Sequence, residues 1–344
     1  MASLFSTEIL LFAVTAALMT LQKKAGATAM TPGTCDAPKE LRNAAFVFVK
    51  PHANTLATQK LVRETLLSKG IEILSEKDID GVTIDEHKLI DQHYYAIASK
   101  ATILPAKDIP VPADKFVQEF GEPWDQVLKE DRACNAMEAC KRFNVNADGL
   151  DALWQTATKV AKFGGGFYCG LVRKDNLELY VFNAFFMSMR SKFVGKDCSI
   201  HCFEVQWSPT SLSWEDFRNV VLGPTDPAEG PPGSLRKTIL ERYQALGLKD
   251  EPNKGDNGVH ASASPFEGLA ERINWLGKSI EADSFGKALL DAGLPVSTIQ
   301  EWSVDPRIPM PDGSIGSVFD ALEDMNVDEC LAKMVALNSL GDAI

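Results

Sequence analysis

Residues 257–271 read NGVHASASPFEGLAE and place a histidine, His260, shortly before an expected helix start. The whole chain has five histidines, so this one stands out among small residues. An imidazole can attack phosphorus directly, and a carboxylate on its other nitrogen fixes the tautomer and the ring orientation. Glu271 lies about two turns into the expected helix, where its side chain can fold back toward the histidine. The pair therefore predicts a nucleophilic histidine.

Other polar residues suit a polyphosphate ligand. Lys50 ends an expected buried strand, Arg236 lies near a helix start, and Thr225 stands in a Pro/Gly-rich loop. Asn257 and His260 fall on the last short strand. Cations, a hydroxyl and a helix N-terminus that converge on one histidine make a polyphosphate site. Phosphoryl transfer requires little covalent work beyond positioning and charge neutralisation.

The elements that must position these residues begin with strand, helix and strand. AAFVFVKP (44–51) is typical of a buried strand, 57–70 of an amphipathic helix ending at Gly70, and 71–77 of a short strand. A second helix is expected over 84–98 and carries His93 and Tyr94.

Residues 99–182 are less regular. We expect helices near 114–142 and 147–162, then a hairpin whose strands contain FYCGLV and LELYVF. FGGGFYCG (163–170) also admits a phosphate-loop interpretation, but no Lys-Ser/Thr follows the glycines, and alternation favours the hairpin.

The C-terminal half alternates again between helices and strands. A helix is expected over 183–193, a strand over 199–207, a helix from Ser213 to Gly223 and a helix over 234–247. Ser264, Pro265 and Glu267 form a strong helix-start signature for a helix that runs through Leu276. After Gly277 the chain is helical in pattern, with a turn at 306–316.

The net charge of −12 argues against non-specific attraction of the whole molecule to nucleic acid or anionic lipid. Residues 278–344 contain 12 Asp+Glu against 4 Lys+Arg, a net of −8, so most of the negative charge lies in this tail. The rest is close to neutral, which leaves room for a basic phosphate site. We expect the tail to be a docking segment or a subunit contact.

Seven scattered cysteines argue against a disulfide framework and for a reducing compartment, and we expect a cytoplasmic protein. Cys198, His201 and Cys202 could suggest zinc, but CSIHCFEVQW is typical of a strand, which would send their side chains to different faces.

An apolar run of 14 residues, EILLFAVTAALMTL, stands near the N-terminus and is short for a membrane span. A signal peptide requires a basic segment before its apolar run, but no Lys or Arg precedes this run. We favour a docked or loosely attached helix, and a targeting segment is the alternative.

GPTDPAEGPPGSLR (223–236) and NGVHASASPFEGLAERINWL (257–276) together resemble the nucleoside diphosphate kinase family. That family has a G-x-T-x-P-A-x-x-x-P-G-T-I-R loop, then N-x-x-H-G-S-D-S and a following Glu and Trp. FVFVKP (46–51), DQHYYAIA (91–98) and NAFFMSMRSKF (183–193) resemble further family segments, in the same order. The resemblance covers about 150 residues, in pieces, between residues 44 and 277.

The resemblance implies a role for each matching residue. His260 would become phosphohistidine, Glu271 would orient its ring, and Ser262 would support Glu271. The phosphates would be held by Lys50, Tyr94, Thr225 and Arg236. Asn257 would bind the sugar hydroxyl and Phe185 would stack on the base, which tolerates different bases because every base has a π-face. Mg²⁺ would arrive on the nucleotide phosphates with few protein ligands, so no protein metal site is expected.

The sequence departs from the family pattern at several positions. The family's arginine six residues before the loop threonine falls on Asn219, with Arg218 next to it. A shift of one residue on a helix turns a side chain by about 100°, which puts this phosphate contact in question. The family's K-P-D-G reads Lys50-Pro51-His52-Ala53, and H-G-S-D-S reads His260-Ala261-Ser262-Ala263-Ser264.

We therefore expect an α+β fold: a ferredoxin-like antiparallel sheet with helices on one face, an inserted α/β subdomain and a helical C-terminal extension. The expected parts are an N-terminal apolar segment and linker (1–39), a kinase-like domain (40–277) with an insertion at about 99–182, and the acidic extension (278–344). A second, shorter insertion between Arg236 and Asn257 falls where the family builds oligomer contacts, so the resemblance implies a homo-oligomer without implying the family's usual hexamer.

Two functions follow from this interpretation. The first is a nucleoside diphosphate kinase, which moves the γ-phosphate of a nucleoside triphosphate to a nucleoside diphosphate by a ping-pong mechanism through His260. The second is a nucleotide-binding or assembly module with little turnover, which the altered Asn219 and the two insertions favour. We expect no nucleic-acid or membrane partner in either case.

Overall fold

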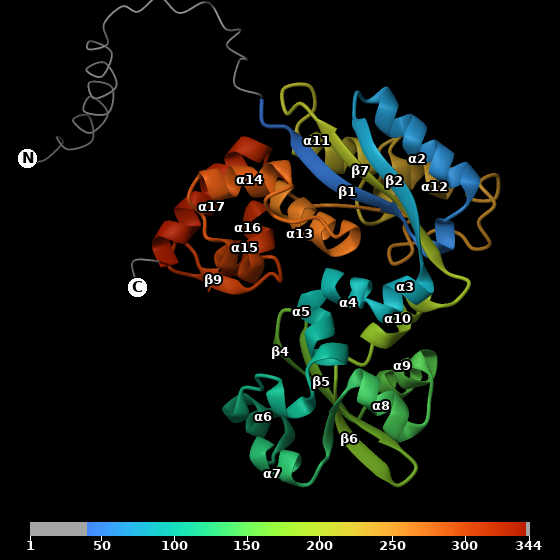
Figure 1. Cartoon of the computed structure of the whole chain (residues 1–344). Coiled ribbons are helices and arrows are strands. Elements are labelled where there is room, and N and C mark those ends of the chain that lie inside the picture. Colours follow the sequence, from blue (N-terminus) through green and yellow to red (C-terminus); the bar gives the residue numbers. More distant parts are fainter. Residues whose placement is uncertain (1–39, 342–344) are drawn as a thin grey trace, which may run out of the picture. The chain divides into compact units, whose positions relative to one another are not determined.

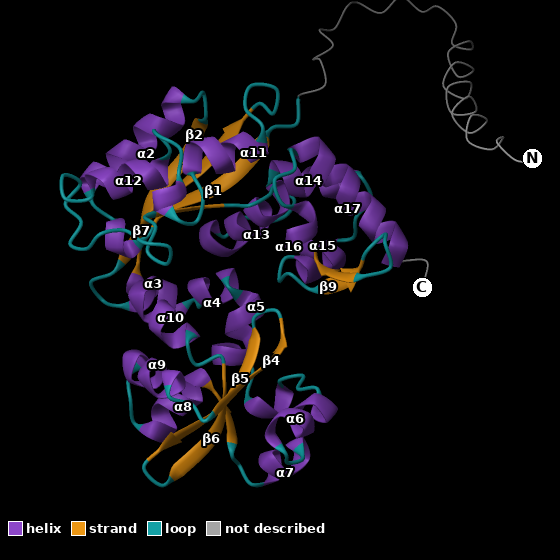
Figure 2. Ribbon diagram, turned by 180° about the vertical axis from the view of Figure 1, so that it is seen from behind, coloured by secondary structure: helices purple, strands orange, loops and turns teal. Residues whose placement is uncertain are grey.

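A computed structural model describes residues 40–341 (Figures 1 and 2). The predictions for the N-terminal apolar segment and for Cys35 lie outside the described residues. No helix among the described residues has the length and apolar character needed to cross a membrane. The six cysteines of the described part are all free thiols.

The main sheet has four strands in the order β2-β7-β1-β8, and every neighbouring pair is antiparallel. Its strands are β1 (Asn43–Val49), β2 (Glu72–Asp80), β7 (Ser199–Trp207) and β8 (Val259–Ala261). Helix α2 (Leu56–Ser68) joins β1 to β2, and α12 (Leu235–Arg242) lies between β7 and β8. This order is that of the ferredoxin-like βαββαβ motif, as predicted.

Alternation along β1 divides the core between the two faces of this sheet. Ala45, Val47 and Val49 pack with residues of α2 and α12. Phe46 and Phe48 point the other way, toward α13 (Pro265–Leu276) and the segment after β2. The expectation of helices on one face is therefore wrong, because a large aromatic row on β1 requires cover on the second face as well.

The expected helix over 84–98 is broken into short pieces. The structure has α3 (Gly81–Glu86), α4 (Leu89–His93) and α5 (Tyr95–Ala98), followed by a π-turn at Ser99–Ile103. Lys88 has a left-handed φ of 53°, which interrupts the helix before α4. The break lets Ile84 and Ile90 both reach the aromatic face of the sheet.

Residues 99–182 contain a second sheet in the order β3-β6-β5-β4. The strands are β3 (Ala133–Asn135), β4 (Lys159–Gly164), β5 (Phe167–Lys174) and β6 (Leu177–Phe182), and the helices are α6 (Ala113–Phe120), α7 (Trp124–Lys129), α8 (Ala136–Phe143) and α9 (Ala147–Gln155), with a 3₁₀ turn at Ala106–Asp108. The expected helix over 114–142 is wrong, because Gly121, with φ 80°, and Pro123 end α6. The helix expected over 147–162 ends at Gln155, and residues 159–164 form β4 instead. The predicted hairpin of FYCGLV and LELYVF is confirmed as β5–β6, and the glycine run lies just before it, in the turn between β4 and β5.

The remaining elements follow the predicted pattern closely. They are 3₁₀ turns at Pro51–Ala53 and Pro227–Glu229, α10 (Phe186–Val194), α11 (Trp214–Asp216), a π-turn at Phe217–Leu222, α14 (Ser284–Asp291), α15 (Val296–Trp302), β9 (Arg307–Pro309), β10 (Ile315–Ser317), α16 (Val318–Leu322) and α17 (Val327–Gly341). The turn expected at 306–316 joins β9 and β10 as a hairpin.

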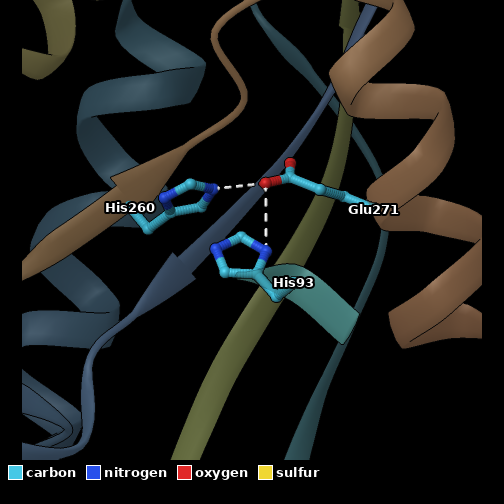
Figure 3. Close-up of side chains that lie close together, drawn as sticks. All are labelled: His93, His260 and Glu271. Carbon is cyan, nitrogen blue, oxygen red and sulfur yellow. Dashed lines mark hydrogen bonds and ion pairs between the residues drawn. The ribbon is translucent and has the colours of Figure 1, made fainter. Parts of the chain in front are cut away.

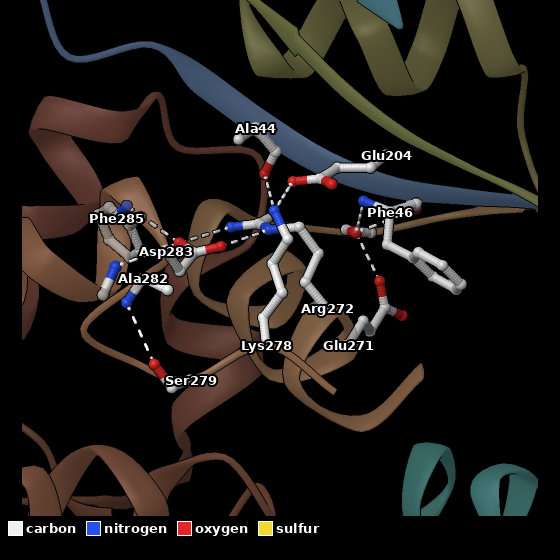
Figure 4. Close-up of polar contacts among 12 residues, drawn as sticks. Ala44, Phe46, Glu204, Glu271, Arg272, Lys278, Ser279, Ala282, Asp283 and Phe285 are labelled. Carbon is white, nitrogen blue, oxygen red and sulfur yellow. Dashed lines mark hydrogen bonds and ion pairs between the residues drawn. The ribbon is translucent and has the colours of Figure 1, made fainter. Parts of the chain in front are cut away.

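The C-terminal helices pack on α13, as Figures 1 and 2 show. Phe266 and Leu269 of α13 belong to the same apolar cluster as residues of α14 to α17. Arg272, fully buried, donates to both carboxylate oxygens of Asp283, at 2.7 and 3.0 Å, and to the carbonyl oxygen of Ala44 (Figure 4). This bond set ties α13, β1 and the start of the extension together.

Candidate active site

His260 lies on β8, at the edge of the main sheet, directly opposite Phe48 in the register. Their rings stack with centroids 4.7 Å apart and an interplanar angle of 27°. The imidazole therefore faces the same side of the sheet as the aromatic row of β1. Because β8 is an edge strand, groups from beyond the edge can also reach this ring.

Glu271 holds the imidazole from α13. Its Oε1 lies 2.6 Å from Nε2 of His260, as the prediction required (Figure 3). Its Oε2 accepts a hydrogen bond from the buried hydroxyl of Ser262. The backbone N–H of Phe46 on β1 donates to the hydroxyl oxygen of Ser262 at 2.9 Å, and the backbone N–H of Ser262 donates to the carbonyl oxygen of Phe46 at 3.1 Å. The carboxylate is thus fixed through the strand next to the histidine.

The start of α13 sets the position of Glu271. Ser264 is the N-cap, and its side chain accepts from the backbone N–H of Glu267 at 3.1 Å. Pro265 occupies the first helical position, and Gly277 ends the helix with φ 68°. This is the predicted helix, with start and stop as the sequence indicates.

Burial lowers the pKa of His260 well below its usual value, and the charges of Lys50, Arg236 and Arg218 lower it further. The imidazole is therefore neutral near pH 7, with one proton. Burial raises the pKa of Glu271 to about 7. When Glu271 is ionised it can only accept, so the imidazole proton lies on Nε2 and the lone pair on Nδ1. Within residues 40–341, Nδ1 makes no hydrogen bond.

Two predicted cations lie close to this ring. Lys50 directly follows Val49, the last residue of β1, and lies on the same face of the sheet as Phe48. Burial and the charge of Arg236 lower the pKa of Lys50 to about 8. Arg236, almost completely buried on α12, donates to the carbonyl oxygens of Val259 and Gly223, at 3.0 Å each. These bonds fix the guanidinium against β8, and burial lowers its pKa to about 10.

Arg218 is the third cation, and the π-turn at Phe217–Leu222 explains its place. Such a turn holds one residue more than an α-helical turn, as the bond from Gly223 N to Arg218 O, at 3.0 Å, shows. The family's arginine position falls on Asn219, one residue after Arg218. The extra residue in the turn compensates for this one-residue difference. Arg218 acts on the pKa of both His260 and Arg236, whereas Asn219 is exposed.

The acidic extension forms ion pairs with Arg218. Nη1 of Arg218 donates to Oε1 of Glu323 at 2.5 Å and to Oδ1 of Asp324 at 2.8 Å. The backbone N–H of Asp324 also donates to the carbonyl oxygen of Ala263, just after β8, at 3.0 Å. The extension therefore docks beside the histidine.

Asn257 and Thr225 form the rim on the other side. Nδ2 of Asn257 donates to the carbonyl oxygen of Thr225 at 2.9 Å, which ties the loop to β8. The Thr225 residue is exposed. Oδ1 of Asn257 is buried and has no partner within the described chain. A buried acceptor of this kind requires a donor, such as a ligand hydroxyl.

Tyr94 and Phe185 have different surroundings. Tyr94 contacts the ring of His93 edge-on. Burial raises the pKa of its phenol to about 12, the charges of Glu271 and Glu267 raise it further, and the charge of Arg236 lowers it. Phe185 instead packs against Trp154 and Tyr168 of the 99–182 segment, with ring centroids 6.1 and 5.7 Å away. The structure therefore does not bring Phe185 to His260, and its role toward a base stays a prediction.

His93 belongs to the site, although sequence reasoning gave it no role there. Its Nδ1 lies 3.3 Å from Oε1 of Glu271 and 3.3 Å from the indole nitrogen of Trp275. Its ring meets that of His260 edge-on, with centroids 4.6 Å apart. Burial and the neighbouring His260 lower the pKa of His93 to about 3. Its place directly before Tyr94 was the available signal.

A cavity of about 440 Å³ adjoins the site. Its lining includes His93, His260 and Glu271, then residues of α5 and α13, and Asp305 and Phe319 of the extension. One side of the site therefore leads into a pocket walled partly by the extension.

The cysteine–histidine group of β7 does not gather. His201 bonds to Asp78 at 2.9 Å, whereas the buried thiol of Cys202 meets the carbonyl oxygen of Lys77. Among residues 40–341, the group of metal-ligating atoms that does gather consists of His93, His260 and Glu271.

No protein-family model matches this chain, and no curated protein matches it. Its structure is similar to nucleoside diphosphate kinases. The enzyme from Encephalitozoon cuniculi is 12% identical, covers 70% of this chain and 92% of its own, and has a TM-score of 0.34. That from Aquifex aeolicus is 12% identical, covering 70% and 99%, with a TM-score of 0.35. An NDP kinase from Pyrobaculum aerophilum is 16% identical, covering 68% and 95%, with a TM-score of 0.31.

Proposed function

We propose that the protein is a nucleoside diphosphate kinase that works through a phosphohistidine at His260. Nδ1 attacks the γ-phosphorus of a nucleoside triphosphate, and the bond from that phosphorus to the β–γ bridging oxygen breaks. The nucleoside diphosphate leaves with the bonding electron pair. An oxygen of the β-phosphate of a second nucleoside diphosphate then attacks the phosphorus and regenerates the imidazole.

The contact between Nε2 of His260 and Glu271 carries this proposal. It directs the lone pair of the ring to Nδ1, the atom that makes no hydrogen bond to residues 40–341. When Nδ1 takes the phosphoryl group while Nε2 keeps its proton, positive charge develops on the ring. The Glu271 carboxylate, held by Ser262, stabilises that charge at no cost of rearrangement.

Charge on the phosphates would be met by Lys50, Arg236 and Arg218, with Tyr94 and Thr225 as neutral donors. Mg²⁺ belongs to the substrate in this proposal and enters on the nucleotide phosphates. The donor atoms of Lys50, Arg236 and Arg218 fit that division, because they attract phosphate oxygens and offer Mg²⁺ no oxygen ligand. The buried Oδ1 of Asn257 supports a sugar hydroxyl as its donor.

The pairing of Arg218 with the extension favours the second candidate function, a nucleotide-binding module with little turnover. Glu323 and Asp324 already take the place that phosphate oxygens would have on this guanidinium. A module of this kind would bind nucleotide without forming phosphohistidine.

One experiment separates the two. The full chain is incubated with γ-labelled ATP, and an acid-labile, alkali-stable label is sought that disappears when a nucleoside diphosphate is added. His260→Ala should lose the label, and His201→Ala, a histidine of β7 distant in sequence, should keep it. An unlabelled native protein that still binds ATP would replace the kinase by the module.

A further inference from the structure

His93, His260 and Glu271 come from α4, β8 and α13, and they converge on one point (Figure 3). One ligand atom from each lies within 4.8 Å of the other two. We infer that these three side chains form a site for a divalent transition metal of the zinc class, and that a metal bound there stops phosphoryl transfer. The second half of this inference rests on the proposed function; the first does not.

The donor set selects the metal. Two imidazole nitrogens and one carboxylate oxygen suit zinc and cobalt, whereas Mg²⁺ prefers oxygen alone. Each of the three residues offers one such atom to the same space.

A metal ion here requires the three ligand atoms, which now lie within 4.8 Å of one another, to rearrange around it. Ligand atoms on a tetrahedral zinc ion are about 3.3 Å apart, given bonds of about 2.0–2.1 Å. Nδ1 of His93 already lies 3.3 Å from Oε1 of Glu271. Nε2 of His260 lies at 2.6 Å and must withdraw by about 0.7 Å. It stands on a three-residue edge strand, where such a shift disturbs few backbone bonds.

The cavity beside the site provides the entry path and the open position. All three ligands line this space of about 440 Å³, so a water molecule or substrate oxygen can complete the coordination. A bound metal would displace the proton on Nε2 of His260. It would also displace the hydrogen bond that the indole N–H of Trp275 donates to Nδ1 of His93.

The proton count explains inhibition. A metal on Nε2 of His260 takes the place of the proton there. A neutral imidazole must then carry its proton on Nδ1, the atom that would attack phosphorus. The lone pair is no longer available, and Glu271 is drawn onto the metal, away from its stabilising role.

The test uses the full chain without nucleotide, with Co²⁺ as a spectroscopic probe and Zn²⁺ in calorimetry. One equivalent should bind, with a cobalt spectrum of tetrahedral character and no thiolate charge-transfer band. His93→Gln should weaken binding about tenfold or more, whereas His201→Gln, which removes a histidine between Glu76 and Asp78, should not. Equal binding by wild type and His93→Gln, or a thiolate spectrum, would overturn the metal site.

The inhibitory half is read on phosphohistidine formation in excess Mg²⁺. Zn²⁺ should suppress labelling of the wild type, and a chelator should restore it. The His93→Gln protein should tolerate about tenfold more Zn²⁺ than the wild type. Zinc bound at this site without loss of labelling would overturn the inhibition. A chain that binds zinc but is never labelled refutes the kinase proposal and leaves the metal site standing.

Discussion

Nε2 of His260 lies 2.6 Å from Oε1 of Glu271, although the two residues come from an edge strand and from the helix that follows it. The contact leaves Nδ1 as the only ring nitrogen of His260 without a hydrogen bond to residues 40–341. Because Ser262 fixes the second carboxylate oxygen, the carboxylate cannot turn away without breaking a buried bond. The local sequence from residue 259 to 271 thus holds the ring in the orientation that the proposed phosphoryl transfer requires.

Glu271→Gln removes the charge but keeps an amide oxygen that can accept from Nε2. We expect phosphohistidine formation to slow about 100-fold, because the carboxylate stabilises positive charge that develops on the ring. Rapid-quench labelling measures the rate, and nucleotide affinity should change little because the ground-state imidazole is neutral. A rate within a factor of about two of wild type would show that Glu271 only orients the ring.

The pH dependence of kcat/KM should be bell-shaped. Activity should rise as Glu271 ionises, with its pKa at about 7, because the protonated carboxyl cannot stabilise the ring cation. It should fall again as Lys50, with its pKa at about 8, loses its charge in the free enzyme. Lys50→Arg should remove the alkaline fall while keeping the acid limb, since a guanidinium does not deprotonate in this range. An unchanged alkaline limb in that variant would assign the fall to another group.

The sequence predicts this part of the molecule well because its signals are local. The buried strand ending at Lys50 and the Ser264-capped helix each follow from residues within one turn or one strand. The strand order does not follow from these local signals, because the whole 99–182 segment separates β2 from β7; the resemblance to the family implied it. The same reasoning fails for 84–98, where the left-handed Lys88 and the need to bury Ile84 and Ile90 break an otherwise helical pattern.

The missed features are non-local. The place of His93 directly before Tyr94 is a sequence signal for the site, but its contact with Glu271 arises only when α4 packs on the sheet. The pairing of Arg218 with Glu323 and Asp324 spans about a hundred residues and depends on the docked extension. The π-turn that directs Arg218 toward the site contains one extra residue, and the amino-acid composition of this segment does not indicate it.

Asn257 should select for a sugar hydroxyl. Its buried Oδ1 has no partner in the described chain, and a hydrogen bond there contributes about 1 kcal/mol, or about fivefold in kcat/KM. We expect the wild type to prefer a nucleoside triphosphate over its 2′,3′-dideoxy analogue by at least this factor, and Asn257→Ala to lose the preference. Steady-state kinetics with both substrates on both proteins measure it. A preference that survives in the variant would place the hydroxyl contact elsewhere.

Asp283→Asn should destabilise the fold. Arg272 is fully buried, and removal of its ionic partner leaves an uncompensated charge, which costs about 3 kcal/mol or more in free energy of unfolding. Burial alone would raise the pKa of Asp283, but Arg272 and backbone N–H donors lower it. This stability should therefore be lost as pH falls through the folded-state pKa. Urea denaturation checks both, with Asp291→Asn, an exposed partner of Lys287, as the matched control.

Release of Arg218 from the extension should strengthen nucleotide binding. In Glu323→Gln/Asp324→Asn the guanidinium keeps neutral acceptors nearby but no longer faces two carboxylates, so phosphate oxygens compete more easily. We expect KM for the nucleoside triphosphate to fall about threefold to tenfold, an effect of 1 kcal/mol or so that suits partly exposed ion pairs. The fall should shrink at high salt, because ions screen the wild-type contact. Glu301→Gln/Asp328→Asn removes the same charge from exposed positions of the extension and should leave KM unchanged. Equal shifts in both double variants would mean that overall charge, rather than the Arg218 contact, governs binding.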